Sequence, residues 1–226
     1  MRMLGSSQMT RVLENQVALE MATARTADVS KRLHLGCFDR PIRGWINTDV
    51  TPHLWVARTP GSATLLWRLG RISDHRYDQH RRGVFRSVRY MNVAKRFPYP
   101  DNYFGAAFSS HLLEHLRPVD AQCCLSEILR TLQPGGICRV VVPDLDILVN
   151  SYDPRKPDIF LRRLLEPSEH QKNSHHWLYN AGSLIALVLQ TGFQRAYRCG
   201  YQQGQCPDLD VLDNRPEVSL YVEAIK

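Results

Sequence analysis

A short apolar segment that ends in a glycine turn, followed by a single acid, constrains this chain most. The segment from Leu33 to Leu35 runs directly into Gly36-Cys37, and Asp49 ends a second short apolar segment. Glycine lets a ligand approach the backbone closely, and a carboxylate can accept hydrogen bonds from both hydroxyls of a ribose. A strand, a glycine turn and a downstream acid in this order predict an α/β fold that holds the adenosine half of a cofactor.

Length and charge limit the kind of protein further. The 226 residues suit one α/β domain with elaborations, which is enough chain for a sizeable core. A formal net charge of +7 favours an acidic partner such as a phosphate, a nucleic acid or an anionic membrane surface. Many arginines lie between residues 58 and 89, and they form either a positive binding patch or a solvated basic face.

The cysteines and the apolar segments bear on where the protein is found. The six cysteines show neither a CxxC pair nor the spacing of a disulfide scaffold, so we expect reduced thiols. No signal-peptide core is visible, and no segment approaches the roughly 18 apolar residues that span a bilayer. The sequence therefore predicts a soluble, cytoplasmic protein without a transmembrane segment.

Segments typical of strands alternate with segments typical of helices along most of the chain. An amphipathic helix is predicted at 9–27, and residues 1–30 are expected to form a lid or packing segment. One domain is expected at 31–226, with an Arg-rich insertion at about 51–89. Strands are expected at 32–35, 45–50, 87–93, 105–109, 137–142, 193–199 and 218–225, and helices at 63–69, 119–132, 159–165 and 181–191. A turn is expected at 134–136. This alternation predicts a mostly parallel sheet covered on both faces.

Several short motifs occur in the order seen in class I S-adenosylmethionine-dependent methyltransferases, and the chain resembles that family. The motifs are Leu33 to Cys37, Gly44 to Asp49, Phe97 to Asp101, Ser110 to Leu116, Leu132 to Gly136 and Val142 to Asp144. The resemblance covers most of residues 31–226 and includes 219–224, which are similar to the last strand of such proteins. It implies a Rossmann-like α/β fold, with a seven-stranded, mostly parallel sheet, helices on both faces and an antiparallel last strand.

The resemblance also implies S-adenosylmethionine as the cofactor, lying across the carboxyl ends of the first strands. The residues that match the family's cofactor motifs are Gly36, Cys37, Asp49, Asn92, Val93, Ser109 and Ser110. Among them, Asp49 would bind the ribose, Asn92 and Val93 would border the adenine, and the serines would line the methionine end.

One position departs from the family's pattern. Phe38 stands where the family usually has another glycine, and His34 replaces an acid often found in the same motif. A side chain at position 38 costs room and backbone freedom. The turn can follow a different path, or cofactor affinity can be weak, so a non-catalytic cofactor-binding module stays an alternative.

Methyl transfer to an alcohol needs a base, or a metal ion that lowers the pKa of the hydroxyl. The candidate catalytic residues are His111, Asp144 and His176, which follow predicted strands or lie in a loop that could cover the cleft. Asp144 could equally bind a sugar hydroxyl, act as base or cap a helix. Asp144, Asp146 and Asp153 offer hard oxygen ligands for a divalent metal such as Mg²⁺.

Aromatic and imidazole side chains supply candidate contacts to the acceptor. The predicted substrate-binding residues are His115, His175, Trp177 and Tyr179. Aromatic faces stack on the apolar faces of sugars, and imidazoles hydrogen-bond to hydroxyls. The competing interpretation is that His115 is structural and that the other three lie in a partly buried loop before a helix.

The pattern is most similar to bacterial family members that methylate sugars, polysaccharides and glycolipids, including mycobacterial enzymes that act on mannose-containing polysaccharides. This resemblance implies O-methylation of a sugar or oligosaccharide acceptor in polysaccharide biosynthesis, with a homodimer left open and nucleic acid not expected as the partner. An RNA or protein methyltransferase is the main catalytic alternative, because the Arg-rich stretch could bind phosphates or acidic side chains.

Overall fold

The computed structural model describes residues 31–165 and 174–226. The helix predicted at 9–27, and the lid role given to residues 1–30, lie outside the described residues. In the described part of the chain, no helix is both long enough and apolar enough to cross a membrane.

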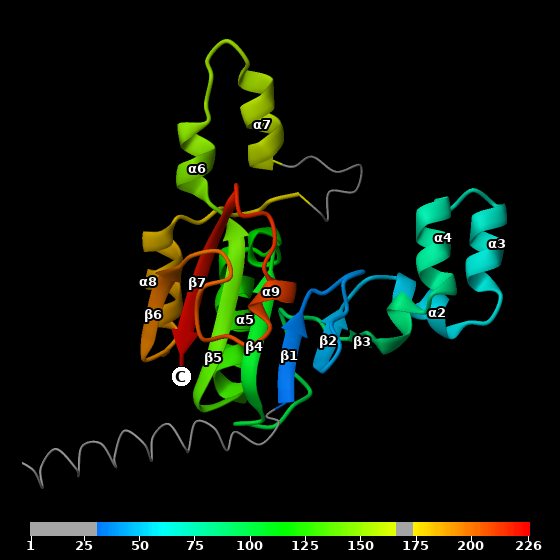
Figure 1. Cartoon of the computed structure of the whole chain (residues 1–226), viewed down its shortest axis with the longest axis horizontal. Helices are drawn as coiled ribbons and strands as arrows, with labels where there is room; N and C mark the ends of the chain where they lie inside the picture. The colour runs from blue at the N-terminus through cyan, green and yellow to red at the C-terminus, as the bar shows by residue number, and fades with distance from the viewer. Residues whose placement is uncertain (1–30, 166–173) are drawn as a thin grey trace, which may run out of the picture. The chain divides into compact units, whose positions relative to one another are not determined.

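A seven-stranded sheet in the order β3-β2-β1-β4-β5-β7-β6 is the framework (Figure 1). The strands are β1 (Lys31–Leu35), β2 (Trp45–Asp49), β3 (Arg89–Tyr90), β4 (Phe104–Ser110), β5 (Leu132–Pro143), β6 (Arg195–Cys199) and β7 (Ser219–Ile225). Strands β3, β2, β1, β4 and β5 pair in parallel, whereas β7 is antiparallel to both of its neighbours, β5 and β6. The predicted Rossmann-like fold with an antiparallel last strand is therefore confirmed.

Alternate side chains of the central strands enter two different cores. In β5, Val140 and Val142 belong to one buried cluster and Val141 belongs to another. In β4, Ala107 belongs to the first of these clusters and Phe108 to the second. Successive residues of a strand point to opposite faces of a sheet, so a continuous apolar run marks a strand covered on both sides.

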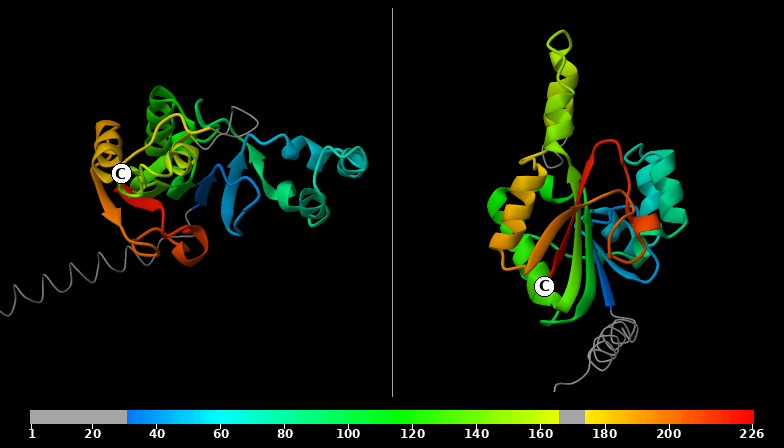
Figure 2. Two further views of the ribbon diagram at one scale, coloured as in Figure 1. Left: turned by 90° about the horizontal axis from the view of Figure 1, so that it is seen from above. Right: turned by 60° about the vertical axis from the view of Figure 1, so that its left-hand side comes forward.

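One face of the sheet is covered by α5 (Pro118–Thr131) and α8 (Ala181–Gln190), which lie on the same side of the strands (Figures 1 and 2). Cys124, Leu125 and Ile128 of α5 are fully buried, and their spacing of three and four residues makes one apolar stripe. α8 starts with a capping box, in which Asn180 and Ser183 satisfy each other's backbone N–H groups.

The opposite face lacks a helix between β1 and β2, because residues 36–44 connect these two strands directly. The connection from β6 to β7 covers this face instead, and it contains the short helix α9 (Leu209–Leu212). Leu209 and Leu212 pack there with Phe108 of β4 and Val141 of β5. Helices thus lie on both faces, but a return loop supplies most of the second layer.

A buried ionic cluster holds this return loop on the sheet. Arg139 of β5 is fully buried and donates to Asp213 at 2.8 Å and to Glu223 of β7 at 3.0 Å. The same guanidinium donates to the carbonyls of Gly200 and Gln203, both at 3.0 Å. No buried side-chain nitrogen or oxygen of Arg139, Asp213 or Glu223 lacks a hydrogen-bond partner, so these charges can be buried.

The turn expected at 134–136 lies inside β5 as an irregularity and does not precede the strand. The pairing with β4 passes from Leu132 opposite Phe104 to Ile137 opposite Ala106, so residues 133–136 bulge out of the ladder. Gly135 has a φ of +75°, which a side chain rarely adopts.

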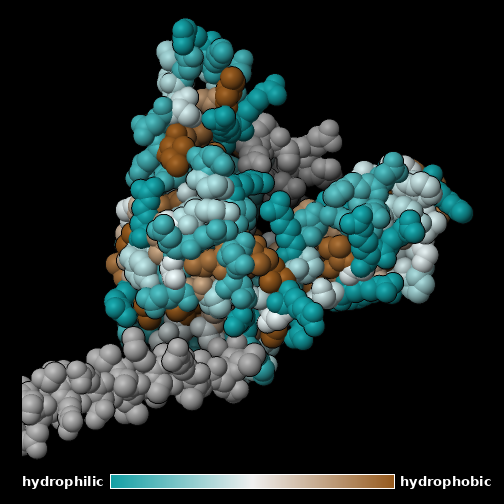
Figure 3. Space-filling view, in the orientation of Figure 1, coloured by the Kyte–Doolittle hydropathy of each residue, from teal (hydrophilic) through white to brown (hydrophobic). Residues whose placement is uncertain are grey.

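Residues 51–89 form a separate lobe beyond β3 (Figures 1 and 2). The lobe contains α2 (His53–Arg58), α3 (Ser62–Arg68), α4 (Asp74–Arg81) and the 3₁₀ turn η1 (Val84–Ser87). Trp67 of α3 stacks on Tyr77 of α4 with ring centroids 4.7 Å apart. Hydrophilic and neutral residues prevail over the outer part of this lobe in Figure 3.

Two further helices, α6 (Leu145–Asn150) and α7 (Pro157–Leu165), project beyond the carboxyl end of β5 (Figure 1). The 3₁₀ turn η2 (Leu113–His115) follows β4 at the same edge of the sheet, where a helical segment was predicted to start at His111. These elements bring loops that follow β1, β2, β4 and β5 to one edge, which is where open α/β sheets bind ligands.

Candidate active site

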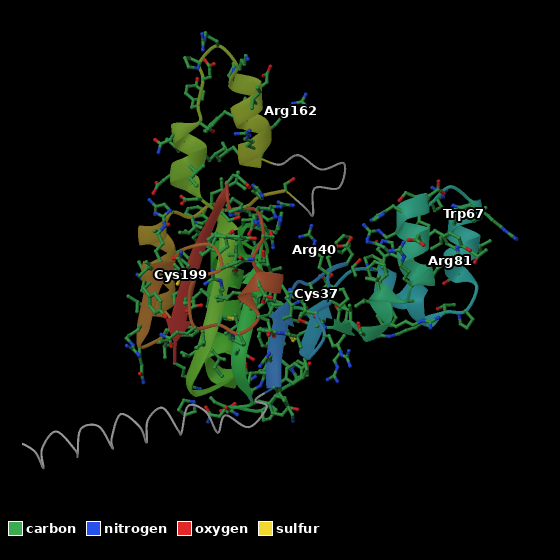
Figure 4. The ribbon with its side chains drawn as sticks, in the orientation of Figure 1. Cys37, Arg40, Trp67, Arg81, Arg162 and Cys199 are labelled. Carbon is green, nitrogen blue, oxygen red and sulfur yellow. The ribbon has the colours of Figure 1, made fainter. Side chains whose placement is uncertain are left out.

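A cavity of about 420 Å³ lies at the carboxyl ends of β1 and β4. The loop after β1 forms one wall, and residues 211–215, which follow or end α9, form the other. Gly36, Cys37 and Ser110 line it, as does Arg40, which is labelled with Cys37 in Figure 4. Its volume falls in the range of about 300–1,000 Å³ that is typical of cofactor and small-molecule sites.

The glycine turn at the start of this cavity is required by space as well as by conformation. Gly36 has a φ of +62°, and a Cβ there would lie only 3.0 Å from the side chain of Leu112. The next residue, Cys37, donates its backbone N–H to Thr48 at 3.1 Å and buries its thiol. Burial raises the pKa of this thiol to about 12, so Cys37 stays protonated and is not a nucleophile.

Phe38 adopts a left-handed backbone conformation and does not pack inward. Its φ is +45°, and its backbone N–H donates to Oδ2 of Asp49 at 2.9 Å. The residue is 40% exposed and lines the cavity, and the centre of its ring lies 4.6 Å from the guanidinium of Arg76 in α4.

The insertion also holds the next residue of this loop. Arg76 and Gln79 of α4 both donate to Oδ2 of Asp39, at 3.1 and 2.9 Å. Burial alone would raise the pKa of Asp39, but the hydrogen bonds from Gln79 and Arg76 outweigh it and lower that pKa. The sequence analysis missed this contact, because nothing local relates Arg76 to a loop almost forty residues earlier.

Asp49 has the chemistry that the ribose of a nucleotide requires. It ends β2, is half-buried, and accepts one backbone hydrogen bond at each oxygen, from Phe38 and from Thr51 at 2.7 Å. Burial raises its pKa, although the backbone hydrogen bonds oppose that shift. Each carboxylate oxygen keeps a second lone pair that could accept from a ribose diol. Asp49 does not itself line the cavity, and contacts it through Phe38, which does.

The remaining predicted cofactor residues divide between the cavity and the core. Ser110 lines the cavity and accepts a hydrogen bond from Asn214 at 3.2 Å. Asn92 accepts from the N–H of Ala94 at 3.0 Å and closes a local turn. Val93 is buried in the core and Ser109 is fully buried within β4, so neither side chain reaches the cavity. That Val93 borders the adenine and Ser109 the methionine end stays a prediction, which would have to be met by their backbone.

A second cavity, of about 380 Å³, adjoins the first at the carboxyl end of β5. Its walls come from β5, α6, α7 and the segment before β7. They are lined by Pro143, Asp144, Ile147, Leu148, Ser151, Arg162, Arg163, His175 and Val218, together with His111 and Arg215. His111 and Arg215 line both cavities, so they lie where two bound molecules would meet. Arg162 of α7 is labelled in Figure 4.

His111 is held between two polar groups at this junction. It has a φ of +50° and donates its backbone N–H to Val141 at 2.9 Å. Nε2 lies 3.2 Å from Oγ of Ser219, and Nδ1 lies 3.2 Å from Oε1 of Glu114. A carboxylate on one side of an imidazole orients the ring and stabilises its protonated form, which is the arrangement of a general base.

Asp144 is engaged structurally. Its Oδ1 accepts from the N–H of Asp146 and caps α6, and its Oδ2 accepts from Arg198 at 3.1 Å. Of the three roles left open for it, the structure shows the helix cap. Asp146 hydrogen-bonds to Asn180 and Asp153 to Arg155, so the expected oxygen site of Asp144, Asp146 and Asp153 does not form among the described residues.

The residues predicted to contact the acceptor are also separated. His175 lines the second cavity, whereas His176 and Trp177 are exposed outside it. Tyr179 is only 2% exposed and packs in the core, so the aromatic platform predicted for Trp177 and Tyr179 is wrong. Tyr179 lies there because it bridges to Asp144 beside β5 and its carbonyl accepts from Leu145.

Comparison with known proteins agrees with this architecture. Residues 72–140, from the start of the α4 region to the middle of β5, match a family profile described as a methyltransferase domain. This match includes β4, His111 and Glu114, and begins after Gly36 and Asp49.

Solved structures from several bacteria have a similar fold. A possible histamine N-methyltransferase from Thermotoga maritima is 15% identical, with 91% of this chain and 86% of that chain covered and a TM-score of 0.49. A possible exported protein from Bordetella parapertussis is 12% identical, with coverage of 94% and 67% and a TM-score of 0.50. An S-adenosylmethionine-dependent methyltransferase from Mesorhizobium loti is 15% identical, with coverage of 90% and 95% and a TM-score of 0.46. At such identities the likeness concerns the fold alone.

The strand order and the matched domain bear on the class of this chain. The sheet has the strand order of the class I methyltransferase fold, and residues 72–140 match a methyltransferase domain, which together indicate a methyltransferase.

Proposed function

We propose that this methyltransferase transfers the methyl group of S-adenosylmethionine to a hydroxyl of a sugar, an oligosaccharide or a glycolipid. The observation that carries this proposal is the pair of adjoining cavities that share His111 and Arg215. Methyl transfer requires two molecules bound with the reacting atoms in line, and two cavities with one common wall supply that arrangement.

The first cavity is the cofactor site in this proposal. Asp49 would accept from the ribose hydroxyls, the loop from Gly36 to Arg40 would lie along the cofactor, and Ser110 would lie near its methionine end. When bound, S-adenosylmethionine supplies a methyl group on a positively charged sulfur. The protein's own part is to hold the acceptor oxygen on the far side of that methyl group and to keep water away.

The second cavity is the acceptor site. Its arginines and Ser151 are hydrogen-bond donors, and Ile147, Leu148 and Val218 add apolar surface, which together suit the mixed faces of a sugar. The choice of a sugar over other hydroxyl compounds rests on the resemblance to bacterial polysaccharide methyltransferases.

His111 is the proposed general base. Its Nε2 would take the proton of the acceptor hydroxyl as the oxygen's electron pair forms the bond to the methyl carbon, and the bond from sulfur to that carbon breaks with its pair left on sulfur. The products are a methyl ether, a neutral thioether and a proton on His111. Glu114, 3.2 Å from Nδ1, would stabilise the imidazolium that forms.

Calorimetry and a labelling screen test this function. The full chain should bind S-adenosylmethionine and its demethylated product, and should then transfer a labelled methyl group to members of a panel of mono- and oligosaccharides. An absence of binding to either nucleotide at millimolar concentration would overturn the enzyme proposal.

The same screen should include RNA and protein acceptors. Labelling of RNA that weakens steeply with added salt, without labelling of any sugar, would show that the acceptor is a nucleic acid and that the arginines of residues 51–89 bind phosphates.

A further inference from the structure

Three side chains gather beside the acceptor cavity, and the proposed methyl transfer uses only one of them, Glu114. Glu114 and His115 belong to η2, and His175 comes from the segment after α7. One carboxylate oxygen of Glu114 and one ring nitrogen of each histidine all lie within 4.8 Å of one another. His175 also lines the acceptor cavity, so this cluster borders the place where the hydroxyl would bind.

The carboxylate of Glu114 is buried with one ionic contact and no hydrogen bond among the described residues. Its exposed fraction is 0%, and among the described residues neither of its oxygens accepts a hydrogen bond. Its contact is with His111, whose Nδ1 lies 3.2 Å from Oε1 without the geometry of a hydrogen bond. A buried carboxylate without hydrogen bonds is costly, so a cation in contact with the other oxygen would stabilise this site.

The two histidines are held in the tautomer that binds metals. Nδ1 of His115 lies 3.3 Å from the carbonyl oxygen of Ser174, and Nδ1 of His175 lies 3.2 Å from that of Leu164. A carbonyl oxygen can only accept, so the proton is assigned to both Nδ1 atoms, and in the neutral ring Nε2 then carries the lone pair. Histidines that bind metals usually donate their other N–H to a backbone carbonyl in this way.

The backbone fixes the cluster in place. The N–H groups of His176 and Trp177 both donate to the carbonyl of Glu114, at 2.7 and 3.2 Å, and so attach the segment after α7 to η2. The rings of His115 and His175 lie 5.2 Å apart between centroids. Ligands on two attached segments need only small shifts to surround an ion, since tetrahedral coordination at 2.0–2.1 Å spaces ligand atoms about 3.4 Å apart.

We propose that Glu114, His115 and His175 bind a divalent transition metal of the Zn²⁺ or Mn²⁺ type. Two imidazoles and one carboxylate suit these ions, whereas Mg²⁺ prefers oxygen ligands. The site differs in place and in ligands from the aspartates that the sequence suggested. This inference rests on the proposed function for its role, which is to bind the acceptor oxygen at an open coordination position and ease loss of its proton.

Metal binding is tested directly on the full chain, without cofactor or acceptor. After treatment with a chelator and desalting, titration calorimetry with ZnCl₂, MnCl₂ and MgCl₂ should show one site for Zn²⁺ or Mn²⁺ and a much weaker signal for Mg²⁺. Glu114→Gln and His175→Ala should each weaken this binding at least 100-fold. The matched control is His176→Ala, because His176 is adjacent in sequence but exposed and outside the cluster.

Folding of each variant is checked by circular dichroism and by binding of the demethylated cofactor. Wild-type protein that binds no Zn²⁺ or Mn²⁺, or a folded Glu114→Gln variant that binds the metal as tightly as wild type, would overturn the metal site.

The two proposals can fail separately. Stoichiometric metal binding without cofactor binding would support the site and overturn the methyltransferase function. Methyl transfer at an unchanged rate in the metal-free protein would support the enzyme and overturn the catalytic role of the metal.

Discussion

At the scale of single residues, the proposed contact between Asp49 and the ribose can be tested directly. Asp49→Ala should weaken binding of the demethylated cofactor by roughly 1–3 kcal/mol, because two ribose hydrogen bonds are lost. Titration calorimetry measures the change, and Asp101→Ala serves as control because Asp101 is an exposed partner of Arg130 far from the cavity. Equal affinities for the wild type and Asp49→Ala would contradict the ribose assignment.

His111 is expected to affect the chemical step rather than cofactor binding. His111→Asn is the suitable change, because asparagine tolerates the positive φ found at this position. Turnover in the labelling assay should fall about 100-fold or more, as is typical when a general base is lost, while affinity for the demethylated cofactor stays within a factor of a few. A variant with the wild-type rate would remove His111 from the mechanism.

At the scale of elements, helix α4 supports the cofactor loop from outside the sheet. Arg76 contacts the ring of Phe38 and donates to Asp39, so Arg76→Ala should loosen residues 36–40 and weaken cofactor binding by about 1–2 kcal/mol. Arg82→Ala is the control, because Arg82 is exposed and its ion pair among the described residues is with Asp78 of the same lobe. If both variants bind the cofactor equally well, the insertion does not position this loop.

The return loop between β6 and β7 depends on one buried arginine. Arg139→Met should lower the free energy of unfolding by about 3–5 kcal/mol, because it leaves the carboxylates of Asp213 and Glu223 buried without their cation. Urea denaturation measures the loss. Arg155→Met, which removes an exposed ion pair with Asp153, should cost less than about 1 kcal/mol. A small effect at Arg139 would mean that water or a rearrangement satisfies these acids.

At the scale of the whole molecule, buried neutral histidines make stability depend on pH. Burial lowers the pKa of His34 to about 4 despite its contact with Asn47, and burial also lowers that of His53 to about 4. Since both are near 6.5 in the unfolded chain, stability is highest above pH 6.5 and falls as the pH drops from 6.5 to 4. The buried His34 contributes about 1.4 kcal/mol per pH unit in that window, and the half-buried His53 contributes less because solvent screens it.

The His34→Phe variant isolates one of these contributions. Phenylalanine suits a position between the rings of Trp45 and Phe108, and Asn47 keeps its hydrogen bond from Ile42. Urea unfolding at pH 5 and pH 7.5 should therefore show a smaller difference in the variant than in the wild type. Parallel curves for the two proteins would mean that His34 is charged in the folded state.

Much of the fold was predictable from sequence because the buried strands carry local signals. The apolar run from Ile137 to Val142 predicts a buried strand, and the apolar stripe of α5 predicts a helix. Neither prediction requires knowledge of contacts with distant segments. The second layer was missed because it is a loop held by contacts distant in sequence. The sequence did carry one signal of the cluster that holds this loop. Arg139 and Glu223 have opposite charges and lie in two strands predicted to be buried, and buried opposite charges pair.

The site was predicted only where backbone conformation determines it. Gly36 has the positive φ that its turn requires and lines the first cavity, whereas Asp49 ends β2 as predicted and its contact with a ribose stays a prediction. Tyr179 and Glu114 were assigned incorrectly or passed over, because residue type alone does not tell which way a side chain faces after a strand ends. Glu114 and His115 are far from His175 in sequence, and the three come together only because the segment after α7 is attached to η2.

The direct link from β1 to β2 leaves the first cavity to be completed by residues that follow or end α9, far along the chain from Gly36. A nucleotide could therefore dock there only after a ribosome has released both segments, and no fragment that stops short of Arg215 contains both walls. Arg215 also lines the second cavity, so a change there alters the walls of both cavities at once.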